Sequence, residues 1–151
     1  MGSEMCIRDS LPIVAVDMLS GAVEWAHALH KSPATWLPVS MLDARGIIGP
    51  VRVKGTGPCP MCAHLHRIDA DEQWHEVAQR ASEASRPGDP VTRTAVVMHA
   101  VVTIRRLMGR PTPPGAPRTR PLAGELKEVD LYGVEQHRLV LEHPRCPYCR
   151  G

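Results

Sequence analysis

The sequence of 151 residues contains no phenylalanine, three tryptophans and two tyrosines, and its formal net charge is only +2. Proteins that bind single-stranded nucleic acid stack the bases on aromatic side chains and gather Lys and Arg on one surface. With few aromatic residues and nearly balanced charge, this chain is not expected to bind nucleic acid. It also lacks a run of about 18 apolar residues, the length needed to cross a bilayer, so no membrane span is expected either.

Residues 1–10 lack the continuous apolar stretch of a secretory signal peptide, so we expect a cytoplasmic protein whose thiols stay reduced. The same segment has no hydrophobic periodicity, and its string MCIRDS resembles translated sequencing-adapter read-through. We therefore predict that residues 1–10 are non-native, that the natural protein starts upstream, and that residues 11–151 form one partial domain.

The remaining composition, 43% hydrophobic and 23% charged, is typical of one globular domain. A run of branched apolar residues predicts a strand over 11–17 that is buried on both faces. Apolar residues at helical spacing predict a helix over 22–31, and further strands are predicted over 35–42 and 47–53. A strand, a helix and a strand at this spacing form a βαβ unit, so the predicted fold class is α/β with a parallel sheet.

The second half of the chain predicts two helices. Asp69 and Glu72 resemble a capping box, which would open a helix that ends before Pro87. Asp89 followed by proline is typical of an N-cap and first turn, and the helix behind it is predicted to run to about Gly109. Its predicted buried face consists of Val97, Ala100, Val101, Ile104, Leu107 and Met108, with His99, Thr103 and Arg106 facing outward.

The end of the chain predicts a loop and a hairpin. Residues 110–121 hold five prolines and several arginines, which is typical of an irregular connection. Alternating residues on both sides of Tyr132 and Gly133 then predict a β-hairpin over 125–141.

Four of the five cysteines form two matched pairs, Cys59 with Cys62 and Cys146 with Cys149, and proline follows the first cysteine of each pair. Zinc prefers four such ligands in a tetrahedron, and two C-x-x-C pairs supply them with little strain. Closing the loop of about 80 residues between the pairs costs far less free energy than structural zinc supplies, which is about 10–16 kcal/mol in finger peptides. Because all four ligands are cysteines, no coordination position stays open, and the predicted zinc is structural.

Redox chemistry is the rival interpretation, because Cys-Pro-Tyr-Cys is also the string found at glutaredoxin active sites. There the first cysteine lies at a helix N-terminus, whose partial positive charge lowers the pKa of the thiol. Only two residues follow Cys149, so no helix can form behind the second pair. His64, His66 and His143 lie near the pairs in sequence, but four thiolates leave them no role as ligands. Trp74 is expected to pack in the core.

The order of these features resembles the C-terminal half of the ThiF/ubiquitin-activating superfamily, in which a strand pair leads into the second zinc knuckle. The residues that match there are Val129-Asp130-Leu131, Arg138-Leu-Val-Leu141, His143-Pro144 and Cys146-Pro-Tyr-Cys149. The middle of the chain is most similar to ThiF-like proteins of thiazole/oxazole-modified peptide (TOMM, bacteriocin) biosynthesis. The residues that match there are Leu37-Pro-Val39, Gly46-Ile-Ile-Gly-Pro50, Gly57-Pro-Cys-Pro-Met-Cys62, His64-Leu-His-Arg67, Asp69, Asp71 and Trp74.

This resemblance covers residues 11–151 and implies the C-terminal part of a Rossmann-like ThiF fold with zinc knuckles at 59–62 and 146–149. Such relatives often carry an N-terminal domain that clasps the leader of a precursor peptide. They present the precursor to a YcaO-type cyclodehydratase, which spends ATP to form azoline rings. The chain would then be the scaffold part of such a partner protein, with its leader-binding domain upstream.

Two features separate this chain from the adenylating members of the superfamily. No G-x-G-x-x-G follows a predicted strand, although adenylating members cradle phosphates in such a turn. Those members also have an acidic residue about three positions after the aspartate that ends the first strand. Here Ser20 stands three positions after Asp17. We therefore expect no independent catalysis and assign no catalytic residue.

Two alternatives to the scaffold hypothesis remain open. The chain could be a fragment of a ThiF-family adenylyltransferase that activates a sulfur-carrier protein, or a stand-alone zinc interaction module. If the chain is a truncated part of a longer protein, its parallel sheet lacks neighbouring strands, and residues 11–151 alone are expected to express poorly or to form a homodimer through an exposed strand edge.

Overall fold

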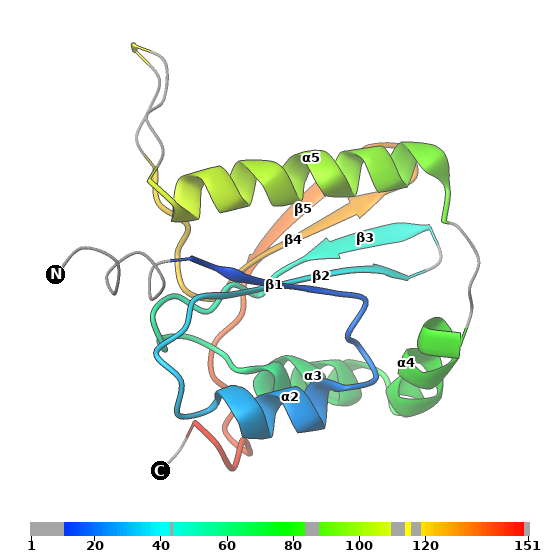
Figure 1. Ribbon diagram of the computed structural model, residues 1–151. Coiled ribbons are helices and arrows are strands. Elements are labelled where there is room, and N and C mark those ends of the chain that lie inside the picture. Colours follow the sequence, from blue (N-terminus) through cyan, green and yellow to red (C-terminus); the bar gives the residue numbers. More distant parts are fainter. Residues whose placement is uncertain (1–10, 43, 84–87, 110–113, 116–118, 150–151) are drawn as a thin grey trace, which may run out of the picture.

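A mixed five-stranded sheet separates two layers of helices. The computed structural model describes residues 11–42, 44–83, 88–109, 114–115 and 119–149, so the prediction for residues 1–10 lies outside it. The elements are β1 (Ile13–Val16), α2 (Ala22–Leu29), β2 (Trp36–Leu42), β3 (Arg45–Ile48), α3 (Pro60–Ala70), α4 (Trp74–Glu83), α5 (Pro90–Leu107), β4 (Glu125–Asp130) and β5 (Glu135–Leu139). Figure 1 shows α5 across one face of the sheet and α2 and α3 across the other.

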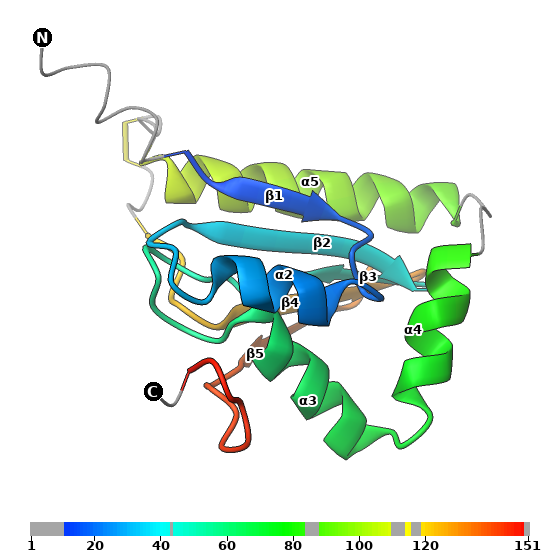
Figure 2. The same cartoon turned by 60° about the horizontal axis from the view of Figure 1, so that its bottom comes forward.

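The sheet follows the order of the chain, β1-β2-β3-β4-β5. Only β1 and β2 are parallel, with Ile13 opposite Trp36, and α2 connects them as the βαβ pattern predicted. The pairs β2–β3, β3–β4 and β4–β5 are all antiparallel. The α/β class is therefore confirmed, and its parallel part is limited to the first two strands. Figure 2 shows these two strands lying over α2.

The predicted third strand, 47–53, is displaced in the structure. The strand β3 begins at Arg45 and ends at Ile48, because Gly49 adopts a φ of 105° and departs from extended geometry. A Cβ at Gly49 would lie 2.4 Å from the carbonyl oxygen of Glu125, so only glycine fits this turn. The N–H of Gly49 donates to the carbonyl of Pro38 at 2.8 Å, which keeps this proline inside an internal strand.

The segment after the first cysteine pair also differs from the prediction. Cys59 is the N-cap of α3, and Pro60 occupies its first turn, so the pair opens a helix. Asp69 lies in the last turn of that helix and is not an N-cap, so the predicted capping box is wrong. The residue that turns the chain toward α4 is Asp71, whose carboxylate accepts the N–H of Gln73 at 2.9 Å.

The helix α5 begins as predicted but is rotated about its axis. The Asp89 carboxylate accepts the N–H of Thr92 at 2.9 Å, which confirms the N-cap. The buried residues are Thr92, Val96, Ala100 and Thr103. Val97 and Val101 of the predicted buried face are 57% and 48% exposed, and Thr103 is only 1% exposed.

The rotation of α5 follows from a close approach to β3. A Cβ at Gly46 would lie 1.9 Å from Cγ2 of Val96, so the missing side chain makes room for this valine. The buried Thr103 hydroxyl donates to the carbonyl of His99 at 2.9 Å, which satisfies it inside the core. Arg106 was also predicted to face outward, but it forms an ion pair with Glu125 at 2.7 Å.

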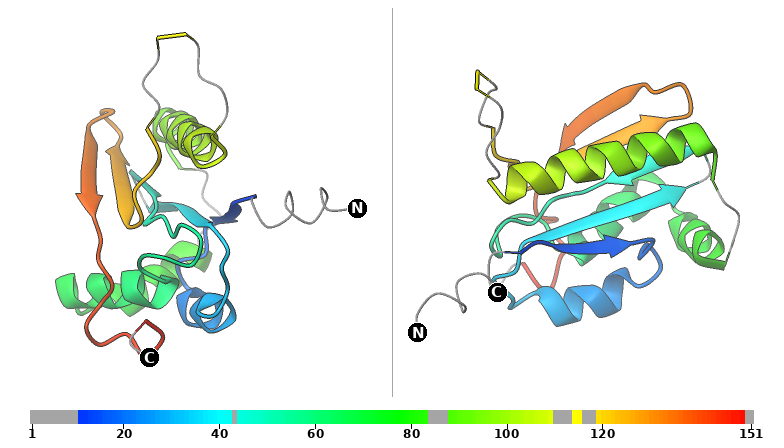
Figure 3. Two further views of the ribbon diagram at one scale, coloured as in Figure 1. Left: turned by 90° about the vertical axis from the view of Figure 1, so that its left-hand side faces the viewer. Right: turned by 45° about the horizontal axis from the view of Figure 1, so that its top comes forward.

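The helix α5 packs on the main hydrophobic core. The buried members of this core are Leu37, Val39, Ile48, Val51, Val96, Ala100 and Val129. The predicted hairpin is confirmed as β4 and β5, with Glu125 opposite Leu139. Figure 3 shows that β5 lies at one margin of the sheet and that the chain returns from it to the α2 and α3 layer. None of the described helices is long and apolar enough to cross a membrane.

The predicted burial of the first strand on both faces is wrong, because only Ala15 of β1 is buried. Among the described strands, β1 pairs with β2 alone and forms an edge. Val14 and Val16 line a groove of about 460 Å³, which they share with Val97 and Val101 of α5. An apolar edge strand of this kind is a template for pairing with another chain.

We predict that the chain self-associates through this edge. Replacing Val16 with Lys puts a charge at a position that is 62% exposed on β1, and sedimentation equilibrium should then show a shift from dimer to monomer. The matched control is Val91→Lys, at a similarly exposed position on α5 outside the groove. A monomeric parent chain would contradict the prediction.

Candidate metal centre

The four paired cysteines come together in space although they are far apart in the sequence. The sulfurs of Cys59 and Cys62 are 3.8 Å apart, those of Cys59 and Cys146 are 3.5 Å apart, and those of Cys62 and Cys149 are 3.5 Å apart. All four lie within 4.8 Å of one another. Because a disulfide requires about 2.05 Å between sulfurs, these are four free thiols.

These distances are those of a metal site. Four sulfurs at about 2.3 Å from a central ion, arranged as a tetrahedron, lie about 3.8 Å from one another. Cys59, Cys62 and Cys146 are at most 2% exposed, and Cys149 is partly exposed. The four cysteines are therefore close enough to hold one metal ion.

The helix α3 supplies the first pair from its N-terminal turn. Cys59 precedes the helix and Cys62 lies within its first turn, where unpaired N–H groups and the helix dipole favour negative charge. The helix that the redox interpretation requires is thus present at the first pair, not at the second. At the first pair the two sulfurs also face the second pair, an arrangement that a two-cysteine redox site does not need.

The close packing of the thiols shifts their pKa values in opposite directions. A hydrogen bond from the Cys59 thiol and another from the N–H of His143 lower the pKa of Cys62 to about 4. The bond with Cys62, together with burial, raises the pKa of the Cys59 thiol. Burial raises the pKa of the Cys146 thiol as well. Four thiolates cannot share this volume without a cation, so metal binding would release protons.

The second pair is held in place by a charged contact with α3. His143 is 2% exposed, its Nε2 lies 2.8 Å from the Asp69 carboxylate, and its carbonyl accepts the N–H of Cys146 at 3.0 Å. Arg145 pairs with the other oxygen of Asp69. The hydrogen bond to His143 holds the pKa of the Asp69 carboxyl below its usual range. Asp69 therefore anchors the C-terminal segment, a role that its sequence position did not reveal.

Arg52 is a buried cation next to the sulfurs, and no pattern in the sequence indicates this position. It is 6% exposed, and its Nη1 donates to the carbonyl of Gly57 at 2.7 Å and lies 3.9 Å from the sulfur of Cys149. Its Nε has no hydrogen-bond partner among the described residues. A guanidinium here offsets part of the negative charge that four thiolates bring to the site.

The histidines near the first pair are not part of the cluster. His64 is buried, burial lowers its pKa, and its Nδ1 accepts the indole N–H of Trp74 at 3.3 Å. Trp74 is itself buried, as predicted. Nε2 of His66 lies 2.9 Å from the carbonyl oxygen of Leu141. These residues pack around α3, and the candidate metal ligands are the four cysteines alone among the described residues.

Comparison with solved structures identifies proteins of the same fold. A heterocyclase in complex with substrate and cofactor matches at a TM-score of 0.63 and 22% identity, over 91% of this chain and 20% of that one. The heterocyclase TruD matches at 0.63 and 18% identity, over 91% of this chain and 22% of TruD. MccB from E. coli, in a structure with MccA-N7isoASN, matches at 0.58 and 16% identity, over 93% of this chain and 40% of MccB.

The chain therefore spans between about a fifth and two fifths of the length of these proteins. No family model matches the sequence, and a search of curated proteins gave no match. At these identities the likeness concerns the fold. It bears out the fold expected from the resemblance, which this chain shares with part of the two heterocyclases and of MccB.

We predict that replacing Asp69 with Asn weakens the metal centre without touching a sulfur. The neutral amide loses the charged contacts to His143 and Arg145, so the C-terminal pair is held less firmly. Thermal unfolding should occur at a lower temperature, and a chelator should remove bound metal roughly tenfold faster. Glu72→Gln, an exposed carboxylate close by, is the matched control. Equal release rates for Asp69→Asn and the parent chain would contradict this role.

Proposed function

We propose that the metal ion is zinc and that its role is structural. Sulfur ligands in a tetrahedral set favour zinc over the hard cations, and a set of four cysteines leaves no position for a substrate. The ion would join α3 to the segment that follows β5. That segment has no regular secondary structure from Val140 onward among the described residues, so metal bonds would take the place of strand pairing there.

We predict about one zinc per chain by elemental analysis. Replacing Cys62 with Ser should abolish binding and lower the unfolding temperature by roughly 10 °C or more, because ligand binding and folding are coupled. Cys6→Ser is the matched control, since Cys6 belongs to neither pair. Parent protein that contains no zinc as purified, or a Cys62→Ser variant that melts at the same temperature as the parent, would sink the zinc assignment.

For the biological role, we propose a scaffold subunit in the biosynthesis of azoline- and azole-containing peptides. The chain would work in the cytoplasm with a YcaO-type cyclodehydratase and a precursor peptide, and it would not adenylate a substrate itself. The observation that carries this proposal is the four-cysteine cluster within a fold shared with two heterocyclases. The MccB structure with an MccA derivative also supports a link between this fold and peptide substrates.

The alternative is a fragment of an adenylyltransferase, and one observation favours it. Asp17 is exposed at the carboxyl end of β1, the end of a parallel strand at which α/β proteins bind ligands. Asp17 also adopts a φ of 53°, and its carboxylate accepts the N–H of Met41 at 3.1 Å. The exposed position would suit a ligand-binding residue, but the contact with Met41 joins β1 to β2. This structural role favours the scaffold proposal over the alternative.

A single substitution separates the two proposals. The chain is added to a YcaO cyclodehydratase and the precursor peptide, and mass spectrometry follows the loss of one water per ring. We predict that the chain raises the rate of ring formation and that Asp17→Asn leaves this increase unchanged. Exchange of pyrophosphate into ATP by the chain alone, abolished by Asp17→Asn, would establish the adenylyltransferase instead.

A further inference from the structure

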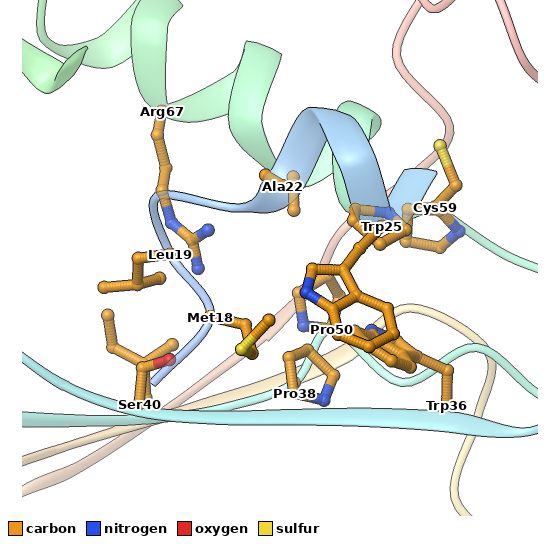
Figure 4. Close-up of a pocket in the computed structure, with 15 residues that line it drawn as sticks. Met18, Leu19, Ala22, Trp25, Trp36, Pro38, Ser40, Pro50, Cys59 and Arg67 are labelled. Carbon is orange, nitrogen blue, oxygen red and sulfur yellow. The ribbon is translucent and has the colours of Figure 1, made fainter. Parts of the chain in front are cut away.

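A small pocket lies between α2, the start of α3 and the face of the sheet opposite α5. Its volume is about 30 Å³, where a water molecule needs about 10–15 Å³ by the same kind of measure. The pocket therefore admits a group of a few atoms and not a nucleotide. Figure 4 shows that apolar side chains from all three elements form its walls. Those walls include Met18, Ala22, Trp36, Pro38 and Pro50.

The guanidinium of Arg67 is the charged group that lines this mainly apolar pocket. The side chain of Arg67 extends from α3 toward Leu19 and Ser40, as Figure 4 shows. Its guanidinium carbon lies 5.2 Å from the centre of the Trp74 ring, but no described residue accepts a hydrogen bond from it or forms an ion pair with it. Burial lowers the pKa of the guanidinium, and Glu128 acts on it only through longer-range attraction.

The other polar groups of the pocket are also donors. Ser40 is 4% exposed, and Trp25 contributes an indole N–H; neither side chain has a hydrogen-bond partner among the described residues. Figure 4 shows the indole nitrogen of Trp25 on the side of Met18. No aspartate or glutamate is among the described residues that line the pocket. A guanidinium, a hydroxyl and an indole N–H within apolar walls are complementary to an anionic acceptor.

We propose that this pocket binds a carboxylate group, with Arg67 as its counter-charge and Ser40 and Trp25 as further donors. A carboxylate matches both the small volume and the planar fork of the guanidinium, which can donate to both oxygens at once. Met18, Leu19, Trp25 and Arg67 are each partly exposed, so the group can enter from solvent. The pocket borders the candidate metal centre, since Cys59 is among its lining residues. The proposal rests on Arg67, Ser40 and Trp25, and it stands whether or not the chain serves a cyclodehydratase.

Tryptophan fluorescence offers a direct test, because Trp25 and Trp36 line the pocket. The chain is titrated with sodium acetate at constant ionic strength and, in parallel, with acetamide, the uncharged analogue. We expect a saturable change in emission with acetate and none with acetamide. Arg67→Gln should weaken acetate binding at least tenfold, and Arg80→Gln, an exposed arginine of α4, should leave it unchanged. Equal responses to acetate and acetamide, or an unchanged affinity in Arg67→Gln, would overturn the proposal.

Ser40→Ala provides a second variant in case Arg67→Gln fails to fold, since it removes one hydroxyl and no charge. We expect it to weaken acetate binding about threefold, and an unchanged affinity would count against the site. A short peptide with one aspartate and its asparagine counterpart then identify the source of the carboxylate. Tighter binding of the aspartate peptide than of acetate assigns an acidic peptide, and equal binding assigns a free small carboxylate. Tighter or equal binding of the asparagine peptide would overturn the proposal.

Discussion

The meeting of four cysteine sulfurs is the constraint on which the rest of the arrangement depends. The last residues of the chain form no strand or helix in the described part. Tyr148 packs against His27 of α2 and His30, and Cys149 lies near Arg52. The cysteine sulfurs and His143, however, attach this segment to α3. The sulfurs connect them to the first turn of this helix, and His143 connects them to Asp69 in its last turn. One helix therefore fixes the C-terminal segment at two points. The hairpin before that segment is held in the sheet in its own right, because β4 pairs with β3.

The cysteine cluster could be predicted because its signal is local. Each C-x-x-C pair brings its own two sulfurs together, and two matched pairs in one chain favour a shared ion over separate sites. The contacts that surround the cluster could not be found in this way. Arg52 and Asp69 are distant in sequence from the cysteines they support, and each resembles an ordinary surface charge in the sequence. The helix α3 was also missed, because its N-cap is a cysteine and not one of the usual Ser, Thr, Asp or Asn residues.

The orientation of α5 shows a second limit of sequence patterns. The helix is apolar on more than one side, so periodicity locates the helix but does not select the face that meets the sheet. The selection comes from Gly46, a residue of another element, whose missing side chain receives Val96. Two threonines then lie on the buried side, where their hydroxyls bond to a carboxylate and to the helix backbone. Polar residues of this kind are predicted to be exposed from a sequence, so the predicted face is rotated: Ala100, Ile104 and Leu107 pack on the core as predicted, but Val97 and Val101 are exposed.

The helix α3 also gives the molecule a rigid connection between two chemically different places. Cys62 lies near its beginning and Arg67 less than two turns further on, so a displacement of the first turn moves the guanidinium as well. If binding at one place displaces the helix, it changes the free energy of binding at the other, and by reciprocity the effect is equal in both directions. A structural metal ion would in this way influence the affinity of the neighbouring pocket for its ligand.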